Sequence, residues 1–182
     1  MFKPKYVKKI IISSTKIKKG IKCAAKWINK NYATKTPILI GILKGVMPFF
    51  GHLLPQLKIN VLTDFIVISS FKGQVKQQSK PTIITNVKTN ITGKDIIIVD
   101  DVLDSARTMK VLISYLKKKR PKSIKIVVLV DKPSERKVAL KPDFAAFSID
   151  SVFIVGFGLD IKEKARNLPY IAEFDQSYLN KI

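Results

Sequence analysis

Three carboxylates within five residues give this chain its clearest indication of chemistry. Asp100, Asp101 and Asp104 stand close together in a protein that has a formal net charge of +21 and only 13 acidic residues. The β-branched run 96–99 before them predicts an interior strand. The amphipathic segment that begins at Ser105 predicts a helix. We therefore expect the three acids to lie on a strand-to-helix turn.

Turns of this kind bind phosphate groups in α/β proteins. Backbone N–H groups converge there, the helix dipole is positive there, and small hydroxyl residues such as Ser105 and Thr108 let an anion approach closely. Carboxylates beside an anion site suggest a ligand that also carries sugar hydroxyls, a divalent cation or a protonatable base. The simpler alternative is a solvated acidic turn, in which Asp104 only caps the helix.

Residues 96–108, IIIVDDVLDSART, closely resemble the phosphoribosyl-diphosphate binding motif of the type I phosphoribosyltransferases. Further segments are similar to the hypoxanthine-guanine branch of that family, in its order and over about residues 36–172. Several separated motifs make a more specific signal than any one of them. These segments are a diphosphate loop at 40–45, the start of a mobile lid at 69–71, a purine-carbonyl loop at 131–133, a purine hood at 141–144 and 153–160, and a final diphosphate contact at Arg166.

The apolar pattern predicts the elements that must position these motifs. Strands are expected at 36–43, 61–70, 82–87, 94–99 and 123–130, and helices at 47–57, at 105–119 and from Ser14 onward. This alternation predicts an α/β fold, a mostly parallel twisted sheet with helices on both faces, as the resemblance also implies. Ligands should then bind at the carboxyl ends of the strands.

The chain length of 182 residues fits one domain, 1–182. We expect its core at about 36–132 and a small hood at about 133–175, joined by the N-terminal segment. The polar stretch 71–80 has a glycine and no apolar pattern, which favours an exposed loop. By resemblance this loop is a lid that begins at Ser70 and Phe71.

The resemblance implies transfer of the 5-phosphoribosyl group from phosphoribosyl diphosphate to hypoxanthine or guanine, which yields IMP or GMP and diphosphate. The 5′-phosphate would rest on the turn formed by Asp104, Ser105, Ala106, Arg107 and Thr108. Asp104 would also act as the general base toward the purine.

The remaining roles implied by the resemblance concern diphosphate, metal and purine. Magnesium is expected as the cofactor, because oxygen ligands and substrate phosphates suit it and no His or Cys cluster suggests zinc. A donor aimed at the purine 6-carbonyl would reject adenine. Lys44, Gly45 and Arg166 would bind the diphosphate, with a cis peptide before Lys44. Asp100 and Asp101 would face the ribose hydroxyls, directly or through Mg²⁺, and Asp160 would hold a second Mg²⁺. In the purine site, which also includes Asp160, Lys132 would donate to the 6-carbonyl, Phe153 would stack on the ring and the Ile154 backbone would contact the ring edge.

The chain departs from the family pattern at three positions. Ala106 stands where glycine is usual, which costs about 1 kcal/mol if the backbone there has a positive φ. Phe71 replaces a tyrosine, so that the ring is kept and the hydroxyl is lost. Asp100 replaces a glutamate that is one methylene longer. The carboxylates Asp64, Glu135 and Glu173 carry no functional signal.

Composition narrows the remaining choices. Residues 1–63 contain 13 lysines and no acid, which raises a second hypothesis, a non-enzymatic RNA-binding regulator on the same fold. Few arginines and no interleaved aromatics argue against specific nucleic-acid binding.

A single cysteine, Cys23, and the absence of a long apolar run predict a soluble cytoplasmic protein with no membrane partner. Related folds form dimers or tetramers, so we expect a homodimer or homotetramer. The preference between guanine and hypoxanthine, and the use of xanthine, stay open.

Overall fold

The computed structural model describes residues 2–69 and 81–181. Its helices are α1 (Ser14–Asn31), α2 (Met47–Leu53) and α3 (Arg107–Lys117), and three short 3₁₀ segments cover Leu54–Gln56, Pro133–Glu135 and Gln176–Tyr178. Its strands are β1 (Val7–Ile12), β2 (Ile38–Leu43), β3 (Leu62–Ser69), β4 (Thr82–Ile83), β5 (Asp95–Leu103), β6 (Ser123–Asp131), β7 (Phe144–Ser148), β8 (Ile154–Val155) and β9 (Ile171–Phe174).

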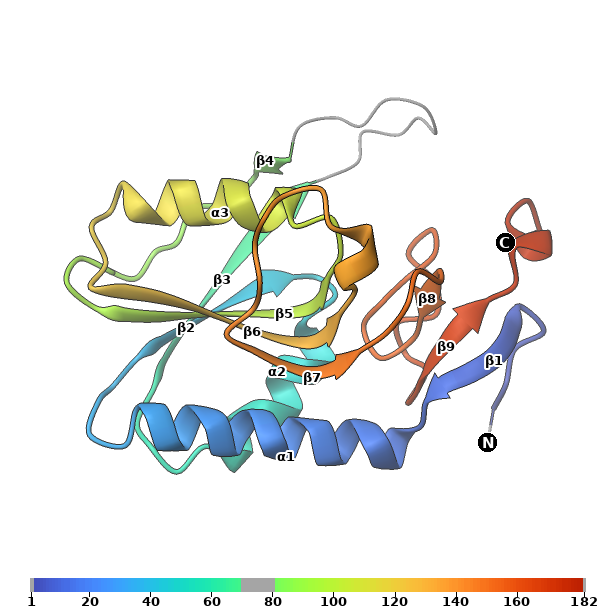
Figure 1. Ribbon diagram of the computed structural model, residues 1–182, viewed down its shortest axis with the longest axis horizontal. Coiled ribbons are helices and arrows are strands. Elements are labelled where there is room, and N and C mark those ends of the chain that lie inside the picture. The colour runs from blue at the N-terminus through green and yellow to red at the C-terminus, as the bar shows by residue number, and fades with distance from the viewer. Residues whose placement is uncertain (1, 70–80, 182) are drawn as a thin grey trace.

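The central sheet of the described structure has six strands in the order β4-β3-β2-β5-β6-β7. All neighbouring pairs are parallel except β3 and β4. Helices α1 and α2 cover one face of this sheet and α3 covers the other (Figure 1). The predicted α/β fold, a mostly parallel sheet with helices on both faces, is confirmed.

Alternation of side chains along the strands explains why both faces are covered. Successive residues of a strand point to opposite faces, so the continuous apolar run of β5 supplies two cores. Ile97 and Val99 join the cluster under α1 and α2, whereas Ile96 and Ile98 join the cluster under α3. All four are fully buried, with 0% exposure. A strand that is apolar on both faces is typical of a parallel sheet interior.

A second, antiparallel sheet joins the two ends of the chain. Its described strands have the order β1-β9-β8, and it lies beside the carboxyl ends of the central strands (Figure 1). The sequence placed the whole range 133–175 in a hood, but β7 pairs with β6 and extends the central sheet instead. The five residues of β7, FAAFS, have no alternating pattern that would show which sheet the strand joins.

Several predicted element limits are wrong. Helix α2 ends at Leu53 and gives way to a 3₁₀ turn, because Pro55 lacks the N–H that a helix interior needs. The strand expected at 82–87 covers only Thr82–Ile83. The N-cap of α1 is Ser13 and not Ser14, with its hydroxyl accepting from the Lys16 N–H at 3.4 Å. The predicted lid, including Ser70 and Phe71, lies outside the described residues.

The order of the strands identifies where a ligand should bind. From β2 the chain moves to β3 on one side and then to β5 on the other, so β2 and β5 flank the point where the strand order reverses. Open α/β sheets bind ligands at the carboxyl ends of the strands beside such a point. Lys44 directly follows β2, and Asp100 and Asp101 lie near the end of β5.

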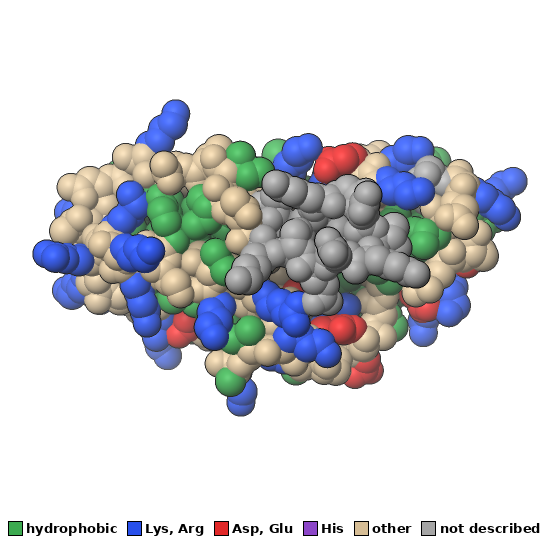
Figure 2. Space-filling model, turned by 90° about the horizontal axis from the view of Figure 1, so that it is seen from above, with side chains coloured by type: hydrophobic (Ala, Val, Ile, Leu, Met, Phe, Trp, Pro, Cys, Tyr) green, Lys and Arg blue, Asp and Glu red, His purple; other side chains and the backbone are tan. Residues whose placement is uncertain are grey.

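Charge is distributed widely over the surface. On the face shown in Figure 2, Lys and Arg side chains are spread along the whole length of the molecule. No helix within the described ranges 2–69 and 81–181 is long and apolar enough to cross a membrane.

Candidate active site

The acidic segment divides between a strand and a turn. Strand β5 continues to Leu103, so Asp100 and Asp101 are strand residues and only Asp104 lies in the turn before α3. The prediction that all three acids share the turn is therefore wrong. The helix also begins at Arg107 and not at Ser105. Residues Asp104 to Ala106 form a tight connection whose N–H groups precede a helix N-terminus.

Asp104 does not cap α3. Its carboxylate accepts a short hydrogen bond from the Ser105 N–H, before the helix begins, and the side chain is exposed. The N-cap position is Ala106, where no side chain caps the helix. The structure therefore does not favour the alternative in which Asp104 serves only as a helix cap.

Ala106 adopts the positive φ that is usual for glycine, although it is an alanine. Its φ is +62° and its ψ is +8°, in the left-handed region, and the residue is 2% exposed. The left-handed conformation costs an L-residue about 1–2 kcal/mol. The turn thus keeps the shape that a glycine would give it, and packing of the buried methyl group against the α3 core offsets part of the cost.

This geometry predicts the stability of two Ala106 variants. Ala106→Gly should change the free energy of unfolding by less than about 1 kcal/mol, because relief of strain offsets the loss of a buried methyl. Ala106→Val should destabilise by about 2–3 kcal/mol, because a β-branched residue fits a positive φ poorly and overfills the core. Urea unfolding checks both values. A valine variant as stable as the parent would contradict the described turn.

Arg136, which the sequence did not single out, holds this turn in place. Its Nη1 donates to the Leu103 carbonyl at 2.9 Å and, through a short bond, to the Asp104 carbonyl. Its Nη2 forms a short ion pair with Asp131, at the end of β6. The Lys132 N–H also donates to the Leu103 carbonyl at 2.9 Å. The predicted phosphate turn and the predicted purine loop are therefore joined by hydrogen bonds to shared backbone atoms.

Asp100 and Asp101 influence each other's ionisation. Burial raises the pKa of Asp100 well above its usual range, and the neighbouring Asp101 charge raises it further. Burial also raises the pKa of Asp101, although a hydrogen bond to Asp100 and the charge of Arg166 oppose that effect. Two adjacent, poorly hydrated carboxylates favour a cation or sugar hydroxyls as partners.

The raised pKa of Asp100 predicts how stability depends on pH. The folded protein binds this proton more tightly than the unfolded chain, whose aspartate pKa is about 3.9, so stability falls as pH rises from about 4 through the higher folded value. Asp100→Asn should therefore raise the urea midpoint at pH 7 in the presence of a chelator. The difference from the parent should vanish near pH 4. A difference that grows as the pH falls would contradict the assignment.

A close approach of three segments shapes the floor of the site. A Cβ atom at Gly45 would overlap the Asp101 carboxylate, and a Cβ atom at Gly158, where φ is +99°, would overlap the Gly45 carbonyl. The peptide between Leu43 and Lys44 is cis, as predicted. Glycine is therefore needed where the loop after β2 meets β5 and the segment after β8.

Arg166 and Lys44, both predicted to bind diphosphate, meet around Glu163. Lys44 Nζ lies 3.0 Å from Glu163 Oε2, and Arg166 Nη2 lies 3.3 Å from Glu163 Oε1 and 2.8 Å from Asp160 Oδ1. Arg166 Nη1 donates to the Gly158 carbonyl at 2.8 Å. Sequence reasoning missed Glu163, because its partner Lys44 lies 119 residues away along the chain.

Arg166 keeps one donor without a partner. Its Nε is buried and has no hydrogen-bond partner among the described residues. An unpaired buried donor costs about 1–3 kcal/mol, and such groups in native structures call for an explanation. The other two guanidinium nitrogens have partners in Asp160, Glu163 and the Gly158 carbonyl, so an anion that binds beside Arg166 would compete with these carboxylates.

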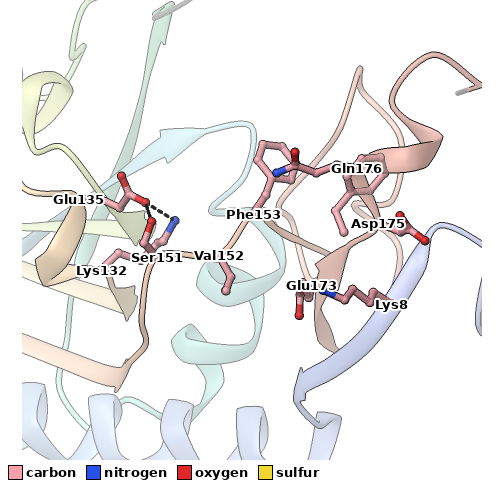
Figure 3. A pocket seen from close by; sticks show the side chains of 10 residues that line it. Lys8, Lys132, Glu135, Ser151, Val152, Phe153, Glu173, Asp175 and Gln176 are labelled. Carbon is pink, nitrogen blue, oxygen red and sulfur yellow. Dashed lines mark hydrogen bonds and ion pairs between the residues drawn. The ribbon is translucent and has the colours of Figure 1, made fainter.

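Two of the four predicted purine residues, Lys132 and Phe153, line a cavity of about 680 Å³, whereas Ile154 and Asp160 are not among its lining residues. Lys132 and Phe153 stand on its wall, with Glu135 and Ser151 on the Lys132 side (Figure 3). Phe153 is 44% exposed, and its ring meets that of Phe174 edge-on, with 5.6 Å between ring centroids. An aromatic face left open to a cavity is available for stacking. Ile154, at the start of β8, is buried, with only 8% of the residue exposed.

The carboxylates of the site are arranged to bind a magnesium ion together with substrate phosphates, and they do not form a complete metal site by themselves. No group of three or more His, Cys, Asp or Glu side chains within residues 2–69 and 81–181 is placed to hold a metal. Proteins commonly hold Mg²⁺ by one or two carboxylates together with substrate phosphates. Asp100 and Asp101 supply such a pair. Asp160 already accepts from Arg166 and from the Glu163 N–H at 2.9 Å.

Comparison with known proteins places this site in a family. A family model described as a phosphoribosyl transferase domain matches residues 9–162. The chain belongs to the phosphoribosyltransferase family. Its relatives include the hypoxanthine-guanine phosphoribosyltransferase of Streptococcus pyogenes serotype M3, 39% identical over 175 residues, which are 96% of this chain and 97% of the relative. The Bacillus subtilis enzyme of the same name is 38% identical and covers 91% of this chain and 92% of its own length.

Solved structures of phosphoribosyltransferases share the fold throughout the chain. A hypoxanthine-guanine phosphoribosyltransferase from Bacillus anthracis has a TM-score of 0.85 and 35% identity, and covers 92% of this chain and 97% of its own. A Trypanosoma cruzi hypoxanthine phosphoribosyl transferase has a TM-score of 0.90 and 27% identity, and covers 100% of this chain and 98% of its own. The resemblance recognised from the separate motifs is confirmed.

Proposed function

We propose that this protein is a purine salvage enzyme that transfers the 5-phosphoribosyl group from phosphoribosyl diphosphate to hypoxanthine or guanine. Two observations together support this function. Relatives with 37–39% identity over nearly the whole chain are hypoxanthine-guanine phosphoribosyltransferases. Three of the residues predicted for that reaction, Lys44, Asp104 and Lys132, directly follow the carboxyl ends of β2, β5 and β6.

The proposed chemistry divides among three parts of the site. The turn after β5 binds the 5′-phosphate through Asp104 to Thr108, with backbone donors and hydroxyls that need no side-chain charge. Lys44 and Arg166 hold the leaving diphosphate as it departs from the anomeric carbon. Asp104, whose carboxylate is exposed and outside the helix, accepts the proton that the purine loses.

The purine would lie in the cavity between Lys132 and Phe153. Lys132 donates to the 6-carbonyl oxygen, the Phe153 ring stacks on the base, and the backbone of Ile154 contacts the ring edge. A donor aimed at position 6 faces an amino group in adenine and remains unpaired. An unpaired buried donor makes such rejection strong.

We also propose Mg²⁺ as the cofactor, held by Asp100 and Asp101 with the substrate and by Asp160 beside the diphosphate. The ion would neutralise negative charge on the phosphate oxygens. IMP and GMP are then the products, the cytoplasm is the compartment in which the exposed thiol of Cys23 stays reduced, and the protein assembles as a homodimer or homotetramer.

A direct assay tests this function. Purified protein with Mg²⁺ and phosphoribosyl diphosphate should convert hypoxanthine to IMP and guanine to GMP, and should leave adenine unchanged. Adenine in the same assay controls for an unselective transferase. Folded protein that forms neither product would reject the proposal. No observation on the structure favours the RNA-binding alternative, and the relatives named above are transferases.

A further inference from the structure

Lys132 is a nearly buried ammonium group that needs a counter-charge. Its side chain is 11% exposed. The ammonium group sits at the end of a flexible four-carbon stem and can donate in several directions, and charge-assisted hydrogen bonds are the stronger ones. If Lys132 is to donate to a purine carbonyl, a neighbouring acid must hold its ammonium group in one direction.

Glu135 is placed to be that acid. Its Oε1 lies 3.7 Å from Lys132 Nζ, and no other carboxylate of the described chain lies within 4.0 Å of that nitrogen. The backbone fixes the spacing, because the 3₁₀ segment that starts at Pro133 lets the Glu135 N–H donate to the Lys132 carbonyl at 3.1 Å. Glu135 therefore stands one tight turn beyond Lys132, on the same side of the cavity (Figure 3).

Ser151 fixes the same carboxylate from a different part of the chain. The Ser151 hydroxyl donates a short hydrogen bond to Glu135 Oε1, the oxygen that faces Lys132. This bond and the Lys132 charge hold the pKa of Glu135 below its usual range. Ser151 lies two residues before Phe153, so the contact also ties the loop that carries the carbonyl donor to the segment that carries the stacking ring (Figure 3).

We infer that Glu135 and Ser151 are positioning residues for purine specificity, holding the Lys132 ammonium group aimed at the 6-oxygen of the base. This inference rests on the proposed function and extends it. Neither residue needs to touch the substrate, because both act through Lys132. Hydrogen bonds to charged groups contribute more to binding than neutral ones. The loss of Glu135 or Ser151 should therefore weaken binding of the base and leave binding of the diphosphate unchanged.

Steady-state kinetics of Glu135→Gln test the inference. The KM for hypoxanthine should rise about 10-fold, whereas the KM for phosphoribosyl diphosphate and kcat should stay within about 3-fold of the parent. Ser151→Ala should give a smaller change in the same direction. Asp150→Asn is the matched control, because it removes a neighbouring carboxylate that has no ion pair with Lys132.

A double variant separates positioning from a general structural role. If Glu135 acts through Lys132, Glu135→Gln should have no further effect on the KM for hypoxanthine once Lys132→Met is present. Full additivity of the two changes, or an unchanged KM in an active Glu135→Gln enzyme, would overturn the inference. Failure of the parent protein to use hypoxanthine would instead overturn the proposed function, and the inference with it.

Discussion

Asp104→Asn is expected to lower kcat for IMP formation by about 10²–10⁴-fold, the range that a general base contributes. The carboxylate is exposed, lies outside the helix and accepts from Ser105 in the turn itself. An amide oxygen can keep that hydrogen bond but cannot take the purine proton. The KM for phosphoribosyl diphosphate should therefore change little.

Thermal unfolding provides the control for the Asp104 variant. Because the side chain is exposed and does not cap α3, the melting temperature of Asp104→Asn should stay close to that of the parent. An unchanged kcat with an unchanged melting temperature would show that another group accepts the proton. Activity lost together with stability would point to a structural role for Asp104.

Arg166→Gln is expected to raise the KM for phosphoribosyl diphosphate by about 10–100-fold. Hydrogen bonds to charged groups contribute about 1.5–3 kcal/mol, and each 1.4 kcal/mol is a factor of ten in affinity. The Arg166 guanidinium group shares the partner Glu163 with Lys44, and this change removes its charge from the predicted diphosphate site. Initial rates at varied phosphoribosyl diphosphate, with hypoxanthine saturating, measure the change.

Glu163→Gln should change the KM for phosphoribosyl diphosphate in the opposite direction to Arg166→Gln. Glu163 pairs with both Lys44 and Arg166, so a diphosphate must compete with its carboxylate for the same two cations. Its removal should lower the KM for phosphoribosyl diphosphate, by less than 10-fold because exposed ion pairs are weak. If both variants raised this KM equally, the two cations would not be the diphosphate site.

The parts of the structure that follow local rules could be predicted from the sequence. The run 96–99 is apolar at every position because β5 is covered on both faces, so its interior placement was predictable. The helix over Ser14–Asn31 could be predicted from its buried stripe, which includes Ile17, Ile21 and Ile28. Lys44 and Gly45 were predicted only from the resemblance to the family's diphosphate loop, and the structure supplies the reason for the glycine, because a Cβ atom at position 45 would overlap the Asp101 carboxylate.

The parts that depend on distant pairing could not be predicted. Arg136, Glu135 and Glu163 are charged residues in polar stretches, and only the fold shows that they face Asp131, Ser151 and Lys44. Strand β5 extends past the acids because Val102 and Leu103 pair with β6, which no local pattern indicates. Strand β7 joins the central sheet for the same reason, since pairing partners decide its place.

The central claim is that the turn between β5 and α3 binds the 5′-phosphate of the nucleotide, and a crystal structure of the protein with IMP tests it most directly. We predict the phosphate group against the backbone of residues 104–108 and the base between Lys132 and Phe153. An IMP molecule whose phosphate lies elsewhere, with that turn contacting only solvent, would contradict the account.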